Sequence, residues 1–133
     1  MTAAERELYE AWLGRARDDL ALAKVALAQE PPITWGVVYH AHQAAEKAFK
    51  AVLSVAGLPP MPTHDLDALA SAVAASGAKL PPLCEETETL SPYAVEPRYP
   101  EVTRDYTVDE AKKAIAAAER VVVTVEEAYG RDG

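Results

Sequence analysis

The residues best suited to chemistry lie in one proline-rich stretch, residues 92–107. Tyrosine offers a ring for stacking and a hydroxyl, and arginine offers a planar set of donors that matches a phosphate. This composition predicts a nucleotide or phosphate contact at Arg98, Tyr99 and Tyr93. Tyrosines packed in the core, with the arginine paired to a neighbouring glutamate, would have the same composition. The sequence leaves both interpretations open.

The histidines and the single cysteine form no metal-binding or catalytic pattern. His40 and His42 are two residues apart, so on a helix they point apart and cannot share one metal ion. No Glu-x-x-His or Cys-x-x-Cys spacing occurs, so we predict no metal and no cofactor. His64 fits a helix-end or packing residue, or a ligand contact because imidazole titrates near neutral pH. Cys84 lies in an acidic stretch that disfavours a thiolate, so we interpret it as structural.

Several charged groups are interpreted as exposed helix surface. These are Glu85, Glu86 and Glu88, the pair Asp18 and Asp19, and the i, i+4 pair of Glu46 with Lys50. Of the two aspartates, we expect one to face water or to pair with Arg15 or Lys24.

Length and charge limit the class of protein. The chain has 133 residues, a net charge of −8 and one cysteine. It is long enough for a single domain with its own core, and it cannot form an internal disulfide. An acidic chain lacks the broad basic surface that holds DNA, so contact with RNA or a nucleotide must be local. No apolar signal peptide or membrane span of about 18 residues is present, and we expect a cytoplasmic protein.

Helical periodicity is strong at both ends of the chain. Residues 2–29 form a predicted helix, with a Thr2–Glu5 capping box and two prolines behind it. A second helix is predicted from Thr34, as N-cap, to residue 56. The apolar stripes at spacings of four and three are Leu8, Trp12, Ala16, Leu20, Ala23 and Leu27, then Val38, Ala41, Ala45, Ala48, Val52 and Val55.

The rest of the chain predicts two short helices, a loop and a final long helix. The short helices cover residues 65–76 and 81–90, and the loop covers residues 92–107. The last helix follows Thr107, with Glu110 completing a capping box, and its seam is Ala111, Ile115, Ala118, Val122, Val125 and Tyr129. We therefore predict an all-α fold without strands, an up-and-down antiparallel helical bundle of four to five helices.

Three motifs are similar to those of a known family. They are Trp12-x3-Ala16-x2-Asp19-Leu20-x2-Ala23; the run from Tyr39 to Leu53 with its Gln43-Ala44-Ala45-Glu46-Lys47-Ala48 core; and Thr63-His64-Asp65-Leu66 with Tyr93-x4-Arg98-Tyr99-Pro100. On these residues the chain resembles the HEPN (higher eukaryotes and prokaryotes nucleotide-binding) domain family over nearly its whole length.

The resemblance implies a helical bundle that forms a homodimer. It also implies association with a separate minimal nucleotidyltransferase, often as a toxin–antitoxin pair. Many HEPN domains are metal-independent ribonucleases that use an arginine followed, after four to six residues, by a histidine. Here no histidine follows Arg98, since His64 is the last in the chain. An imidazole shuttles protons near pH 7, whereas a tyrosine with a pKa near 10 does so poorly.

We favour a nucleotide-binding or partner-binding subunit, not an enzyme, that acts with a nucleotidyltransferase. The Arg98 loop would contact the ligand, with Lys47 and His64 as further candidates. One alternative is a ribonuclease toxin in which Arg98 or Arg104 acts with Tyr106. Tyr106 could instead be a target of nucleotide transfer. Another alternative is a dimeric helical scaffold without a ligand.

Overall fold

The computed structural model describes residues 1–101 and 104–130. The α-helices are α1 (Ala3–Leu27), α2 (Thr34–Val55), α3 (Leu66–Ala75), α4 (Cys84–Leu90) and α5 (Val108–Tyr129). Two short 3-10 helices, η1 (Ser91–Ala94) and η2 (Glu96–Arg98), lie between α4 and α5. The predicted all-α helical bundle is confirmed, and the described residues contain no strand.

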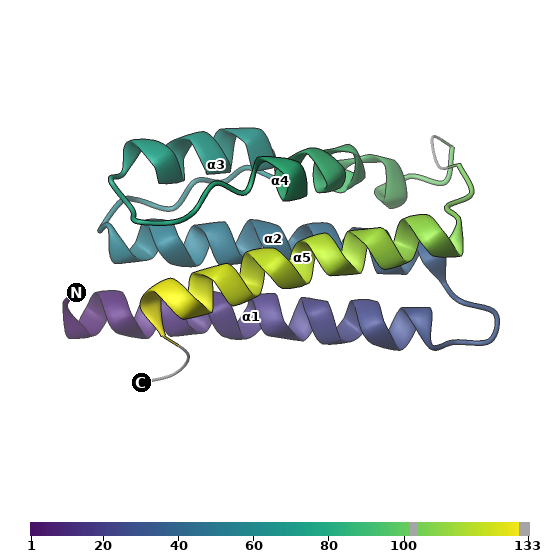
Figure 1. The fold of residues 1–133 in the computed structure, drawn as a ribbon, viewed down its shortest axis with the longest axis horizontal. Helices are drawn as coiled ribbons and strands as arrows, with labels where there is room; N and C mark the ends of the chain where they lie inside the picture. Colours follow the sequence, from purple (N-terminus) through teal and green to yellow (C-terminus); the bar gives the residue numbers. More distant parts are fainter. Residues whose placement is uncertain (102–103, 131–133) are drawn as a thin grey trace.

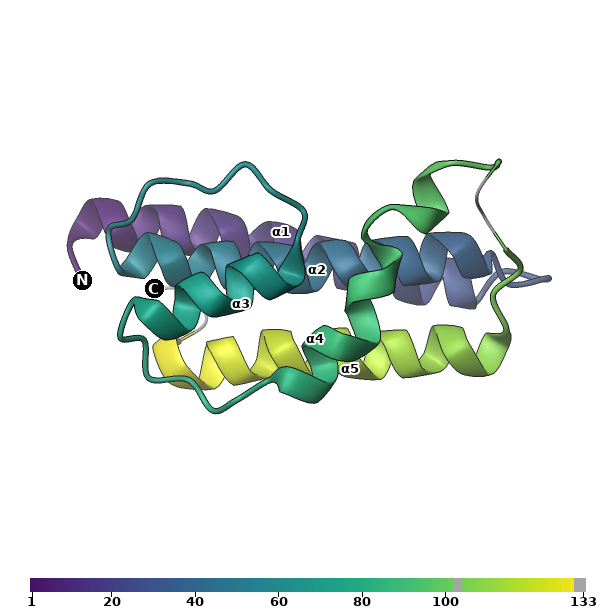
Figure 2. The ribbon, with the colours of Figure 1, turned by 90° about the horizontal axis from the view of Figure 1, so that it is seen from above.

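The three long helices pack along one another, and α3 and α4 lie over α2 and α5 on the side away from α1 (Figures 1 and 2). α1 runs antiparallel to α2 and α5. α2 contacts α1, α3, α4 and α5, so it is the central element. Alanines at 41, 44, 45, 48 and 51 are fully buried, which allows the neighbouring helices to approach α2 closely.

α1 has the predicted capping box, in which Thr2 and Glu5 bond each other's backbone N–H. Its buried face, however, is rotated slightly from the predicted stripe at the N-terminal end. Tyr9 and Leu13 are fully buried, whereas Leu8 is 47% exposed. The cause is a contact far along the chain: the Tyr9 hydroxyl donates to the Gly130 carbonyl at 2.5 Å, which fixes α1 against the end of α5.

Helix boundaries in the middle of the chain differ from the predictions where prolines lie. Thr34 is the first residue of α2 and not its N-cap. α4 begins at Cys84, after the two prolines instead of on them. The predicted loop over residues 92–107 contains η1 and η2, because proline fits the first positions of a short helical turn.

α5 is capped by the Thr107 hydroxyl, which accepts from the Glu110 N–H at 3.0 Å. The Glu110 side chain binds Tyr93 and Arg104, so the predicted capping box is only half formed. The predicted seam is buried from Ala111 to Val125, and Tyr129 is half-buried.

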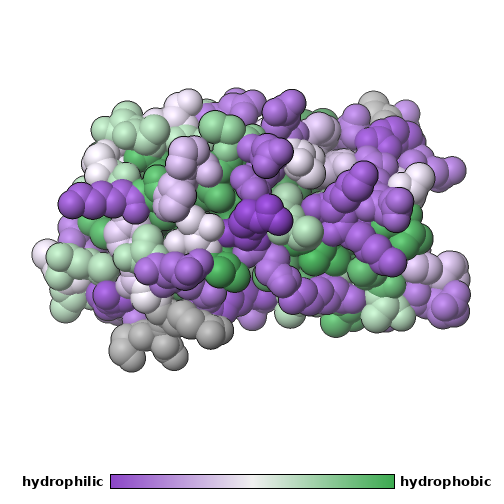
Figure 3. All heavy atoms as spheres, in the orientation of Figure 1, coloured by the Kyte–Doolittle hydropathy of each residue, from purple (hydrophilic) through white to green (hydrophobic). Residues whose placement is uncertain are grey.

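The surface is polar with scattered apolar side chains. Figure 3 shows hydrophilic side chains over most of one face, with separate apolar areas between them. None of the helices over residues 1–101 and 104–130 is long and apolar enough to cross a membrane.

Candidate functional site

The polar residues of α2 concentrate on one side of that helix. We call this set the α2 polar stripe; its members, spaced by threes and fours, are Tyr39, His40, Gln43, Glu46, Lys47 and Lys50. Side chains at this spacing lie on one face of a helix. Most other residues of α2 are apolar and buried, so the stripe is the part of this helix where several charged groups meet within the described residues. Residues from α1, the segment before α3, and η2 complete it.

Asp19 of α1 is the first of two buried carboxylates at the stripe. It is 5% exposed. It accepts from His40 Nδ1 at 2.8 Å through one oxygen and from Lys47 Nζ through the other. Our expectation that one of the two aspartates faces water holds for Asp18, which is exposed. The interpretation as exposed helix surface was wrong for Asp19, because its side chain points across the α1–α2 interface.

Glu46 is the second buried carboxylate, and it is 2% exposed. It accepts from His64 Nδ1 at 2.8 Å and from Lys50 Nζ at 3.0 Å. The prediction that Glu46 and Lys50 lie on exposed surface was wrong, since their side chains are only 3% and 11% exposed. Lys50 also lies 5.4 Å from the centre of the Trp12 ring. Packing against α1 and against the segment before α3 buries this pair.

His40 and His64 are therefore held in the same way, each by a hydrogen bond from Nδ1 to a buried carboxylate. A carboxylate that accepts from Nδ1 places the proton there in the neutral ring and leaves Nε2 as an acceptor. The His64 side chain is 56% exposed and that of His40 is 28% exposed. His64 can thus present Nε2 to a ligand.

Arg98 of η2 joins the same stripe. Its Nε donates to the Ala94 carbonyl at 2.8 Å, and its guanidinium lies 4.9 Å from the centre of the Tyr39 ring. Nη2 makes a long contact of 3.4 Å to Gln43 Oε1. Among residues 1–101 and 104–130 no carboxylate lies within ion-pair distance of Arg98. Its guanidinium is thus oriented by neutral groups.

The other aromatic candidates have different surroundings. Tyr99 is 48% exposed. Tyr93 is 5% exposed and donates to Glu110 Oε2 at 2.7 Å, and burial raises its pKa. Tyr106 is also 5% exposed, and its ring packs edge-on against Tyr93 at 5.7 Å. These two rings pack inside the bundle, which agrees with the interpretation of the tyrosines as core residues.

Arg104 is separate from Arg98. It donates to both oxygens of Glu110, at 2.9 and 2.5 Å, and its guanidinium lies 4.6 Å from the Tyr106 ring centre. These hydrogen bonds, above all, lower the pKa of Glu110 to about 2. The Tyr106 hydroxyl lies 3.3 Å from Glu96 Oε1. Arg104 thus serves to close this end of α5.

His42 lies next to Gln43 of the α2 polar stripe, but its side chain is buried inside the bundle. It is 1% exposed, its Nδ1 lies 3.4 Å from Gln43 Oε1, and its Nε2 has no hydrogen-bond partner among the described residues. Burial lowers its pKa, so the ring is neutral at pH 7. Gln43 Oε1 thus lies 3.4 Å from both His42 Nδ1 and Arg98 Nη2.

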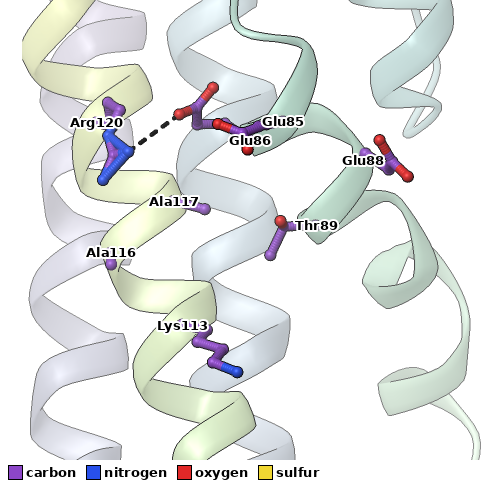
Figure 4. A pocket seen from close by; sticks show the side chains of 8 residues that line it. All are labelled: Glu85, Glu86, Glu88, Thr89, Lys113, Ala116, Ala117 and Arg120. Carbon is purple, nitrogen blue, oxygen red and sulfur yellow. Dashed lines mark hydrogen bonds and ion pairs between the residues drawn. The ribbon is translucent and has the colours of Figure 1, made fainter.

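The acidic residues of α4 lie at a different place, a groove of about 630 Å³ between α4 and α5. Glu86 is 7% exposed and pairs with Arg120 at 3.2 Å (Figure 4). The prediction of a wholly solvated acidic face was therefore wrong for Glu86. Glu88 points away from Arg120, toward the other side of α4 (Figure 4).

Asp19, Gln43 and Glu46 were not identified as site residues from the sequence. A signal was present, because Asp19 adjoins the buried Leu20 and Glu46 adjoins the buried Ala45 in the predicted apolar stripes. An acidic residue at a buried helix position needs a partner. Which partner it finds depends on the neighbouring helices. Within the described residues no group of three acidic, histidine or cysteine side chains could hold a metal ion.

The fold and sequence are similar to those of known proteins. The structure is similar to the crystal structure of TT1696 from Thermus thermophilus, with a TM-score of 0.72 and 28% sequence identity over 90% of this chain and 96% of that one. No curated protein matches the chain. The sequence profile of the HEPN domain matches residues 9–128, which is nearly the whole chain. The protein therefore belongs to the HEPN domain family.

Proposed function

We propose that this chain is a non-catalytic HEPN subunit that binds the phosphate of a nucleotide, free or at an RNA end, at the α2 polar stripe. It does so together with a separate minimal nucleotidyltransferase, as one half of a toxin–antitoxin pair. The observation that carries the proposal is the Arg98 guanidinium, stacked on Tyr39 and without a carboxylate partner in the described chain. An arginine oriented by neutral groups keeps its charge available for a phosphate.

The charge of the stripe supports this choice. Three permanent cations, Lys47, Lys50 and Arg98, face two carboxylates, Asp19 and Glu46, which leaves a local charge of +3 − 2 = +1. The whole chain carries −8, so this region is positive against an acidic background. A local positive site attracts an anionic ligand, whereas the rest of the surface repels long nucleic acids.

In this proposal the predicted ligand residues contribute in different ways. Arg98 binds phosphate, and the exposed Tyr99 ring stacks on the base. Lys47 and the Nε2 of His64 add contacts at the same stripe. Tyr93 supports the loop from inside the bundle and does not touch the ligand.

Nucleotide binding can be tested by isothermal titration calorimetry with ribonucleoside mono- and triphosphates. Arg98→Ala should weaken the best ligand roughly 10- to 100-fold, the range expected for a charged hydrogen bond of about 1.5–3 kcal/mol. Arg15→Ala is the matched control, since it removes the same charge from an exposed position on α1. Equal affinity of wild type and Arg98→Ala would rule out this site. Co-purification with a nucleotidyltransferase encoded by the adjacent gene tests the partner.

We also propose a homodimer. Exposed apolar side chains on α1 and at the start of α2, including Leu22, Val25 and Trp35, are about half exposed and suit a second copy. Light scattering should give twice the chain mass of 14.3 kDa. A mass of one chain at micromolar concentration would contradict the dimer.

A ribonuclease is the second candidate, and one arrangement favours it. Glu46 orients His64 in the way a carboxylate orients a general base, with Nε2 exposed. The base would take the 2′-hydroxyl proton as the 2′-oxygen bonds to phosphorus, and the bond to the 5′-oxygen would break with that oxygen taking a proton from water. Arg98 would stabilise the charged phosphate. Arg104 with Tyr106 is less suited, because each is already bonded to a glutamate. Dose-dependent RNA cleavage that is lost in both His64→Gln and Arg98→Ala would establish this activity in place of simple binding.

A further inference from the structure

A second cavity lies on the other side of α4 from the charged groove, between α3 and α4. It has a volume of about 870 Å³. Its walls are two helix stripes that face each other across a gap: Asp67, Ala70, Ser71 and Ala74 of α3, and Cys84, Thr87, Glu88 and Ser91 of α4 and η1. Because most of these side chains are small, the two helices leave a cleft. We call it the α3–α4 cleft.

The floor of the cleft reaches the hydrophobic core. Phe49, Val73 and Thr87 line it and are 2%, 5% and 6% exposed. Pro81 and Pro82 also line it. Proline restricts the backbone, so this wall is formed before any ligand arrives. The volume lies within the roughly 300–1,000 Å³ typical of small-molecule sites.

Charge at the cleft selects among ligands. Asp67 and Glu88 stand on opposite walls, and both side chains are exposed. Neither carboxylate forms an ion pair with the described residues. Within the described part of the chain, no lysine, arginine or histidine lines the cleft. An apolar cleft with a carboxylate on each wall is complementary to an apolar body that carries a positive charge.

We propose that the α3–α4 cleft binds a small cationic amphiphile, meaning an aromatic or aliphatic amine, independently of the nucleotide site on α2. The apolar body lies over Phe49 and Val73, and the ammonium group lies between Asp67 and Glu88. This binding involves none of the residues assigned to the α2 polar stripe.

The chain provides its own reporter for this cleft. Cys84 is its only cysteine, is exposed and lines the α4 wall. A ligand in the cleft should slow the alkylation of Cys84 by iodoacetamide, and mass spectrometry measures the rate of this reaction. The probes are phenylbutylamine, phenylbutanol and phenylbutyrate, which share one apolar body and differ in charge. At a probe concentration ten times its dissociation constant, the rate should fall about tenfold.

The amine should bind roughly three- to fivefold more tightly than the alcohol, and the carboxylate should bind most weakly. The double variant Asp67→Asn, Glu88→Gln should bind amine and alcohol equally. Glu85→Gln is the matched control, because Glu85 is an exposed acid of α4 outside this cleft. Ala74→Phe should fill the cleft and abolish probe protection, with circular dichroism checking that this variant is folded.

Three results would overturn the proposal. The first is that no probe protects Cys84 at millimolar concentration. The second is that phenylbutyrate protects as well as the amine, or that Glu85→Gln changes the order of affinities as much as the double variant does. The third is that only a protein partner protects Cys84, which would make the cleft a protein-docking surface.

Discussion

Truncation of Glu46 should destabilise the fold far more than truncation of an exposed acid. In Glu46→Ala the Lys50 ammonium loses its carboxylate partner, and the side chain of Lys50 is just 11% exposed. His64 loses the acceptor for Nδ1 at the same time, but it is 56% exposed and can bond to water. The cost therefore comes mainly from leaving Lys50 unpaired.

The magnitude follows from this burial. Removal of one partner of a buried ion pair costs about 3–5 kcal/mol. Lys50 lies near the Trp12 ring and has a flexible stem, so part of this cost is relieved when its ammonium group reaches toward water. We expect a loss of about 2–3 kcal/mol in the free energy of unfolding. For a domain of this size, such a loss lowers the melting temperature by about 8–12 °C.

Urea denaturation followed by circular dichroism measures this loss. Glu119→Ala is the matched control, because its pair with Lys24 has a similar distance of 3.3 Å but side-chain exposures of 42% and 54%. That variant should lose less than about 0.5 kcal/mol. The double variant Glu46→Leu, Lys50→Met should recover to within about 1 kcal/mol of wild type, since it leaves no unpaired charge.

The reasoning is refuted if Glu46→Ala and Glu119→Ala lose the same amount. It is also refuted if the double variant is less stable than Glu46→Ala, because burial of an unpaired charge would then not be the cause.

Two further predictions concern pH. The pKa of Glu110 is lowered by Arg104 from 4.5 to about 2, so the stability this carboxylate contributes is present above pH 4.5 and is lost as pH falls toward 2. Glu110→Gln should be about 1 kcal/mol less stable than wild type at pH 7. Its free energy of unfolding, measured by urea denaturation at each pH, should change less than that of wild type between pH 4.5 and 2. Burial lowers the pKa of His42, so only the unfolded chain takes up this proton near pH 6.5, and stability should fall below that pH by up to about 1.4 kcal/mol per unit. His42→Leu should remove this part of the slope, and equal slopes in both proteins would contradict the assignment.

The helices were predictable because their signals are local. Thr2 with Glu5, and Thr107, cap helices through residues three positions away. The seam of α5 needs only the helical period to be recognised. Errors arose where a distant contact competes with the local pattern, as when Gly130 draws Tyr9 inward and leaves Leu8 exposed.

The candidate site was predictable only in part. Arg98, His64 and Lys47 were selected from residue type and motif, and the structure places all three along α2. Their buried partners, Asp19 and Glu46, were assigned to solvated surface because an acidic residue in an amphipathic helix is usually exposed. α2 is covered on nearly every side, and the sequence of one helix does not state how many neighbours cover it.

The order of residues alone determined that this chain is helical and where its long helices lie. Those properties depend on caps, prolines and the helical period, which act within a few residues. Tertiary structure alone decided that Asp19 and Glu46 each hold a histidine and a lysine, and that α3 and α4 leave a cleft over Phe49. Hydrogen bonds and packing between distant segments have no local signature, because they form only once the helices meet.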